Sequence, residues 1–242
     1  MDLKQQARID LAAILRWSAR LGLNEGVDNH FSVIVPGSEN CFIINPHRRH
    51  WADICASDLV EVDGAGNLIA GDALPEATAF FIHQQIHTKC AHAQAILHTH
   101  MPYTTALSTL DNGRLEPLVQ PALKFYNQIA YDDAYNGLAL DNTEGARLAS
   151  ALADKRIAIL ANHGVITTGP SVAHAFNDLY YLERAAQAQI LAYSTGRPLK
   201  PIPQSVCEMT FQQMQADRDD QATRFLSEIK RLLDKEAPDY AS

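Results

Sequence analysis

The spacing of hydrophobic residues divides the chain into helical and extended segments that alternate along its length. Apolar residues recur at helical spacing over residues 5–21, 75–90, 103–110, 144–152 and 172–195. Short apolar runs predict strands at residues 31–35, 41–45, 59–62, 67–69, 95–100, 156–161 and 165–168, with one or two short extended pieces inside 118–131. Because the strands and helices interleave, we expect a single α/β domain whose mixed sheet is covered on both sides.

Residues with turn and capping chemistry mark the ends of these elements. Ser171 is expected to cap the longest helix, and Thr143 the helix that precedes it, because their hydroxyls can accept a hydrogen bond from a free N–H of the first turn. The residues of segment 36–40 favour a turn, so the strands on either side of it are expected to form a hairpin.

The last part of the chain differs in character from the rest. Two prolines place a linker at residues 199–205, and residues 206–235 have the pattern of two polar amphipathic helices. We therefore expect a main α/β domain at residues 1–199 and a helical extension at residues 200–242 that packs on the same domain.

The composition narrows the class of protein. Of 242 residues, 47% are hydrophobic, which suits a folded chain with a substantial core. The net charge of -8 with scattered Lys and Arg argues against nucleic acid or a membrane surface as partner. We see neither a secretory signal nor a membrane span. The four cysteines are far apart and form no C-x-x-C motif, which favours free thiols and a cytoplasmic protein.

Two histidines stand at the end of the apolar strand at residues 95–100. Side chains two residues apart on a strand point to the same side, so His98 and His100 would present two imidazoles to one point, with Ile96 on their face. Such a pair can chelate a metal at the carboxyl end of a strand, where open α/β sheets bind ligands. Two hydrogen-bonded histidines without a metal are the alternative interpretation.

A third histidine and an acid complete a pattern that suits catalysis. His163 directly follows the second strongly apolar strand, and three neutral imidazoles with an open position are typical of a catalytic divalent-metal site. Such a site needs a carboxylate as base, and Glu76 at the start of a predicted helix is the nearest candidate. The alternative interpretation is that Glu76 stabilises the helix dipole.

Five motifs in a fixed order resemble the class II aldolase/adducin family. The similarity spans about residues 7 to 195, and the motifs are Asn29-His30-Phe31-Ser32, Glu76, His98-Thr99-His100, Asn162-His163-Gly164 and residues 175–185.

The resemblance implies a three-layer α/β/α sandwich with a central mixed, largely antiparallel sheet. It also implies a homotetramer with active sites at subunit interfaces and a divalent metal, most often zinc, with manganese, iron or cobalt as alternatives. It assigns His98, His100 and His163 as ligands and Glu76 as the acid/base. In the aldolases a tyrosine from a neighbouring subunit protonates the departing fragment, and Tyr126 lies in the corresponding region. An interface aromatic is the alternative for Tyr126.

The sequence departs from the sugar-phosphate aldolases where these hold the phosphate. Residues 28–29, 46–49 and 74–75 replace the small hydroxyl-bearing and glycine-containing motifs, although Asn29 and Ser32 remain as candidate substrate-binding residues. We therefore expect a substrate without that phosphate and with a carboxylate, bound by Arg48 or Arg49. A solvated basic turn or a subunit contact are the alternatives for the arginines.

The function implied is a metal-dependent carbon–carbon lyase of the aldolase type, acting on a small carbonyl compound or hydroxy or keto acid through a metal-stabilised enolate. The same enolate forms when carbon dioxide leaves, so a decarboxylase of an aromatic or keto acid is an alternative. Two further alternatives are a non-catalytic scaffold like the adducins, and oxygen chemistry at iron held by three histidines. Epimerisation and dehydration also remain open.

Overall fold

The structure, a computed structural model, describes residues 2–242 and is built around an eight-stranded sheet in the order β4-β3-β2-β1-β5-β8-β7-β6. The strands are β1 His30–Ile34, β2 Cys41–Ile44, β3 Val60–Asp63, β4 Leu68–Ala70, β5 Ala95–Thr99, β6 Ile129–Asp132, β7 Ile157–Leu160 and β8 Gly164–Gly169. Neighbouring strands are antiparallel except β6 and β7, which are parallel because the helix α4 carries the chain from one to the other. The predicted mixed, largely antiparallel sheet is confirmed.

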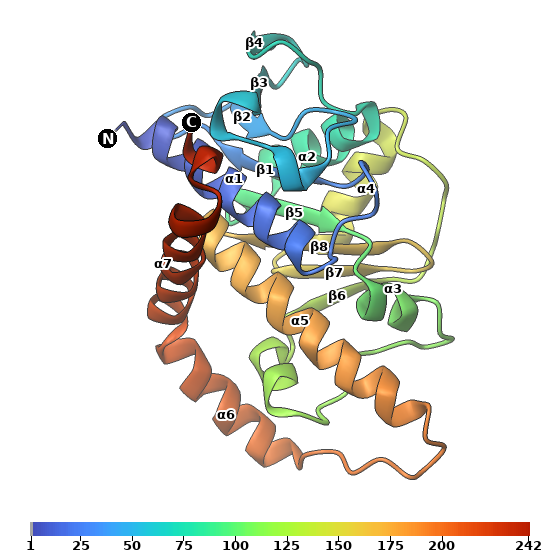
Figure 1. Ribbon diagram of the computed structural model, residues 1–242. Helices are drawn as coiled ribbons and strands as arrows, with labels where there is room; N and C mark the ends of the chain where they lie inside the picture. Colours follow the sequence, from blue (N-terminus) through green and yellow to red (C-terminus); the bar gives the residue numbers. More distant parts are fainter. Residues whose placement is uncertain (1) are drawn as a thin grey trace.

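Helices cover both faces of the sheet, as Figure 1 shows with α1 and α5 in front of the strands and α2 and α4 behind them; α7 lies to the left and packs on α1 and α5. The helices are α1 Leu3–Arg20, α2 Ala77–Lys89, α3 Pro102–Ser108, α4 Asn142–Leu152, α5 Val172–Tyr193, α6 Gln204–Ala216 and α7 Arg218–Glu236. Short 3₁₀ segments are η1 Trp51–Asp53, η2 Ala56–Asp58, η3 Gln120–Phe125 and η4 Pro238–Ala241. This arrangement is the predicted α/β/α sandwich. None of the helices in residues 2–242 is long and apolar enough to cross a bilayer.

Alternation along the strands divides the buried side chains between two cores. Phe31 and Leu97 pack toward α1, α5 and α7, in one cluster with Phe176 of α5. Ile96 belongs to a second cluster, which it shares with Ile82 of α2. Because neighbouring residues of β5 face opposite sides, the residue next to Leu97 in the chain, His98, faces the side covered by α2 and α4.

One local prediction was wrong. Thr143 does not cap α4; Asp141 does, and its carboxylate accepts a hydrogen bond of 2.8 Å from the N–H of Thr143. The carboxylate two residues earlier reaches the free N–H groups first, so the helix starts before Thr143. The strand β6 is the extended piece predicted within 118–131, and it follows η3, where Pro121 in the first turn favours helical dihedral angles. Ser171 caps α5 as predicted, by accepting a hydrogen bond from the N–H of His174.

The two C-terminal helices differ in how they contact the rest of the chain. Leu226, Ile229 and Leu233 of α7 are buried in the same core cluster as α1 and α5. In contrast, α6 contacts η3 and α7 and lies away from the sheet (Figure 1). A boundary between two parts near residue 199 stays a prediction.

Candidate metal centre

The three predicted ligands come from two places in the sheet. His98 is the fourth residue of β5, and His100 follows its last residue. His163 lies in the turn that joins β7 to β8, and β8 is the direct neighbour of β5. The register pairs Thr99 with Val165, so the turn containing His163 lies beside the end of β5.

Glycine allows the close approach of this turn to β5. A Cβ atom on Gly164 would lie 2.7 Å from Cδ2 of His100 and 2.7 Å from the carbonyl oxygen of Thr99. Asn162, two residues earlier, has a φ angle of 56°, a left-handed conformation that asparagine tolerates better than most residues. Backbone geometry therefore accounts for both residues that flank His163, the asparagine before it and the glycine after it.

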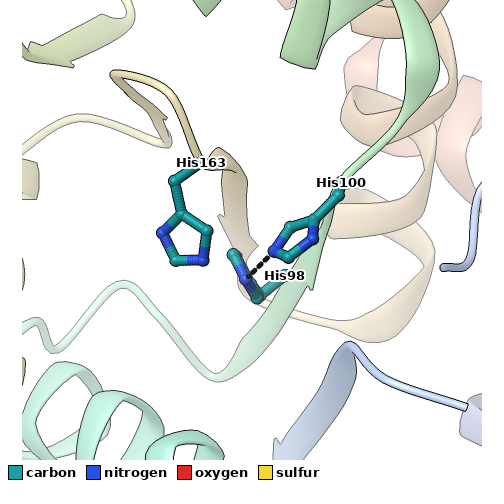
Figure 2. Close-up of side chains that lie close together, drawn as sticks. All are labelled: His98, His100 and His163. Atoms are coloured by element: carbon teal, nitrogen blue, oxygen red, sulfur yellow. Dashed lines mark hydrogen bonds between the residues drawn. The ribbon is translucent and has the colours of Figure 1, made fainter. Parts of the chain in front are cut away.

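The three imidazoles converge on one point, as Figure 2 shows. Their candidate ligand atoms all lie within 4.8 Å of one another. The ring centroid of His163 is 4.8 Å from that of His98 and also 4.8 Å from that of His100. The strand-end pair and the turn histidine thus meet at the distances that a shared cation requires.

Hydrogen bonds orient two of the rings. Nδ1 of His98 donates to the carbonyl oxygen of Val165 at 3.0 Å, and Nδ1 of His100 donates to the carboxylate of Glu25. In the neutral form of each ring Nε2 then carries a lone pair, and these two Nε2 atoms lie 3.2 Å apart. Two lone pairs facing each other at that distance repel unless a cation lies between them. The donor set therefore fits a divalent metal ion.

Burial keeps two of these rings neutral. Desolvation lowers the pKa of His98 well below its ordinary value, and the neighbouring imidazoles of His30 and His163 lower it further. Desolvation and the proximity of His100 lower the pKa of His163 to about 4. A metal ligand must be deprotonated, so both rings are ready to bind a cation at neutral pH.

Glu76 caps the helix α2 and also lines the cavity, while its acid/base role stays a prediction. It is the N-cap of α2, and its Oε2 accepts hydrogen bonds from the hydroxyl of Thr78 and, at 2.8 Å, from the N–H of Ala79. Its Oε1 accepts no hydrogen bond within residues 2–242. Burial raises the pKa of Glu76, but these hydrogen bonds outweigh burial and lower it overall. The residue is thus an ionised carboxylate with one free oxygen.

A cavity of about 290 Å³ contains both the imidazoles and this carboxylate. Residues 134–139 form part of its wall, next to Arg147 of α4. That guanidinium is already paired with Asp132 in a bidentate contact of 2.6 and 2.7 Å, and with Glu144. Among the described residues, the cavity lining therefore offers no unpaired Lys or Arg side chain to an anion.

The predicted substrate-binding residues lie in different places. Asn29 lines the cavity, and its Oδ1 accepts from the N–H of Glu25 at 2.9 Å and from the hydroxyl of Thr99 at 3.3 Å. It therefore fastens the loop that carries Glu25 to the end of β5. Ser32 is fully buried below the cavity and hydrogen-bonded to two histidines.

The other predicted site residues do not line this cavity. Nε of Arg48 donates to His47 at 2.8 Å, and Arg49 forms an ion pair of 2.6 Å with Asp58. The ring of Tyr126 lies against Phe211 of α6, with centroids 6.5 Å apart. A role for any of these three residues in binding or catalysis stays a prediction.

Sequence reasoning did not assign a role to a second group of histidines. His30 of β1 lines the cavity, and behind it lie two histidines of α2, the buried His83 and the half-buried His87. The spacing held a signal, since His30 and Ser32 share one side of a strand, and histidines four apart share one side of a helix. Only the packing of α2 on β1 brings the two pairs together.

The family model described as the class II aldolase and adducin N-terminal domain matches residues 9–190. A crystal structure of an aldolase II superfamily protein from Pseudomonas syringae is 34% identical and has a TM-score of 0.92, covering 99% of this chain and 96% of that one. L-fuculose 1-phosphate aldolase from Glaciozyma antarctica is 27% identical with a TM-score of 0.86, covering 98% and 92%.

Relatives with named activities are also similar. A Caulobacter vibrioides protein, whose name places it among class 2 aldolases, is 37% identical over 195 residues, 79% of this chain and 74% of that protein. The decarboxylase NovR of Streptomyces niveus is 31% identical over 205 residues, 84% and 75% of the two chains. The 4-hydroxy-3-prenylphenylpyruvate oxygenase/4-hydroxy-3-prenylbenzoate synthase of Streptomyces roseochromogenus is 32% identical over 205 residues, 84% and 73%. Together with the matched domain, these similarities establish that the chain belongs to the class II aldolase and adducin family.

Proposed function

We propose that the protein is a divalent-metal-dependent carbon–carbon lyase of the aldolase type, acting on a small carbonyl compound or hydroxy or keto acid. The observation that carries the proposal is the pair of facing Nε2 atoms of His98 and His100, 3.2 Å apart in the cavity that also contains Glu76. His98, His100 and His163 would hold the metal, with zinc as the proposed ion. A bound divalent ion polarises a carbonyl oxygen of the substrate.

Glu76 would move the proton. In the cleavage direction its free Oε1 takes the proton of the hydroxyl group next to the breaking carbon–carbon bond, and the departing carbon receives a proton in return. The hydrogen bonds from Thr78 and Ala79 hold the other oxygen and fix the carboxylate at the cavity wall. The N-cap geometry of α2 is therefore part of the catalytic arrangement.

The charges of the cavity support a substrate without a phosphate group. Arg147 is engaged by two carboxylates, and the described lining also includes Asp28 and Glu76. The two charges of a phosphate dianion would be repelled more strongly by this negative lining than the single charge of a carboxylate, and a carbonyl with an adjacent oxygen needs only the metal. The cavity of about 290 Å³ fits a small molecule.

Decarboxylation at the same site is the second candidate. It is favoured by the similarity to the decarboxylase NovR, and the name of the other Streptomyces relative adds oxygen chemistry. Release of carbon dioxide from a keto or aromatic acid, with oxygen uptake measured in parallel, separates these reactions from aldol cleavage. An adducin-like scaffold would need neither Glu76 nor the three histidines.

A catalytic role for Tyr126 requires a neighbouring subunit, because the residue lies outside the cavity of its own chain. We propose a homotetramer with active sites at subunit interfaces. Light scattering gives the subunit number, and Tyr126→Phe would lower turnover without lowering metal content. A monomer with full activity would contradict this part of the proposal.

Metal analysis followed by an activity screen tests the proposed function. Purified protein is expected to hold one divalent ion per chain and to cleave or decarboxylate keto or hydroxy acids. His98→Ala is expected to lose the metal and keep the fold, whereas His92→Ala, which changes a histidine outside the cavity, should keep both. Wild-type protein that binds no divalent ion would remove the proposal.

A further inference from the structure

A continuous chain of hydrogen bonds runs from the cavity into the core below it. Nδ1 of His30 lies 2.7 Å from Nε2 of His83, and the hydroxyl of Ser32 lies within hydrogen-bond distance of Nδ1 of His83. The same hydroxyl lies 2.8 Å from Nε2 of His87. Nδ1 of His87 ends the chain at the carbonyl oxygen of Ala93, 2.8 Å away.

The direction of every hydrogen bond follows from the last one. A carbonyl oxygen only accepts, so Nδ1 of His87 donates to Ala93 and its Nε2 accepts. Ser32 has a single proton, which it donates to His87, so its oxygen accepts from Nδ1 of His83. Nε2 of His83 therefore accepts from Nδ1 of His30.

This polarity requires each ring to carry one proton, and burial favours that state. Desolvation lowers the pKa of His87 to about 4. Desolvation also lowers the pKa of His83 well below its ordinary value. If His83 or His87 took up a second proton, two donor groups in this series of hydrogen bonds would face each other.

These hydrogen bonds use every ring nitrogen of the three histidines except Nε2 of His30. With Nδ1 as donor, Nε2 of His30 carries a lone pair, and no residue within 2–242 donates a hydrogen bond to it. His30 lines the cavity, and its ring centroid is 4.8 Å from that of His98. The group of close candidate metal ligands consists of His98, His100 and His163 and leaves His30 outside.

We propose that Nε2 of His30 is a fixed hydrogen-bond acceptor for a hydroxyl group of the substrate, with its tautomer set by Ser32, His83 and His87. The inference rests on the proposed function for the position of the substrate beside the three histidines. It narrows the substrate class to compounds that carry a hydroxyl donor in addition to the oxygens that reach the metal. His83, His87 and Ser32 act through His30 and are positioning residues.

The tautomer can be measured without any substrate. Protein labelled with ¹⁵N in the histidine rings is examined by long-range nitrogen–proton correlation spectra, both metal-free and loaded with zinc. His30 is expected to show a protonated Nδ1 and a bare Nε2, and its signals are assigned by their loss in His30→Leu. A protonated Nε2 on His30 would overturn the proposal even if the lyase function holds.

Recognition of the hydroxyl is tested with hydroxypyruvate and pyruvate, which differ only in that group. Zinc-loaded wild type is expected to bind hydroxypyruvate about tenfold more tightly. His30→Leu should lose this preference while keeping its zinc, and Ser32→Ala should reduce it because the tautomer is no longer fixed. His92→Gln, outside the cavity, should keep it.

Three results of the binding test would contradict the inference. The first is that His30→Leu still binds hydroxypyruvate more tightly than pyruvate by the wild-type ratio. The second is that wild type binds the two compounds equally or does not bind hydroxypyruvate. The third is that His30→Leu loses its zinc, which would make His30 a metal ligand. Wild type that holds no zinc fails the proposed function instead, and the tautomer in the metal-free spectrum then decides this inference alone.

Discussion

The two faces of the central sheet are built from the same strands but have different tasks. Strands β1 and β5 pair Phe31 with Leu97, and both side chains are fully buried in the core under α1, α5 and α7. The adjacent pair in the register, His30 with His98, faces the side of α2 and α4. One residue along a strand thus separates apolar core from candidate chemistry, because side chains alternate.

This difference shows how a polar site can exist inside a folded core. The apolar face contains a continuous cluster that can hold the strands in place. On the other face the imidazoles of His83 and His87 and the hydroxyl of Ser32 replace apolar side chains, and each polar atom has a partner. Satisfied partners are the condition for burying such groups without a large cost.

The largest expected effect comes from a substitution that removes catalysis but leaves the stability of the fold unchanged. Glu76→Gln is expected to lower turnover by about 10²–10⁴-fold, because a neutral amide cannot accept the proton. Metal content and melting temperature should stay near wild type, since the amide oxygen can still accept from Ala79. Steady-state kinetics with metal analysis check this, and a fully active variant would refute the catalytic assignment.

The converse experiment removes stability without changing the site. Phe176→Ala, on the apolar face, is expected to lower the free energy of unfolding by about 3–5 kcal/mol, because it empties a buried ring site. Leu191→Ala on the exposed side of the same helix should change it by about 0.5 kcal/mol or less. Urea unfolding measures both changes. If folded Phe176→Ala no longer bound one metal ion per chain, the apolar face would also be needed for metal binding, and the proposed separation of the two faces would be contradicted.

A third change weakens the metal centre from outside. Glu25→Gln is expected to lower zinc affinity about 10–100-fold, since the carboxylate that accepts from Nδ1 of His100 raises the basicity of that ring. Competition with a chelator measures the affinity. Glu39→Gln, at an exposed position, is the control, and equal affinities for the two variants would show that Glu25 does not act on the metal.

A fourth expected effect is a change of stability with pH. Desolvation lowers the pKa of His87 to about 4 and that of His83 well below its ordinary value, so the unfolded chain binds protons more readily than the folded one. Stability is therefore full above about pH 6.5 and falls as the pH drops toward about 4. Urea unfolding of metal-free protein across this range tests the slope, and His87→Gln should flatten it.

Local sequence patterns determine most of the secondary structure and which side of each element a residue faces. The alternation at residues 95–100 predicted that His98 shares a face with Ile96, and the hydroxyl of Ser171 predicted the start of α5. The family motifs predicted the fold. Thr143 failed because Asp141, two residues away, competes for the same N–H groups. Where two candidates differ only in reach, the pattern does not decide between them.

The site itself depended on contacts between distant segments. Only the order of β5, β8 and β7 brings His163 to the strand-end pair, and only the packing of α2 on β1 joins His30 to His83 across 53 positions of the chain. Periodicity fixes which side of an element a residue faces, because that is a property of the backbone alone. Which elements then face each other is decided by burying all apolar surfaces at once, so the meeting of the histidines emerged from the tertiary structure.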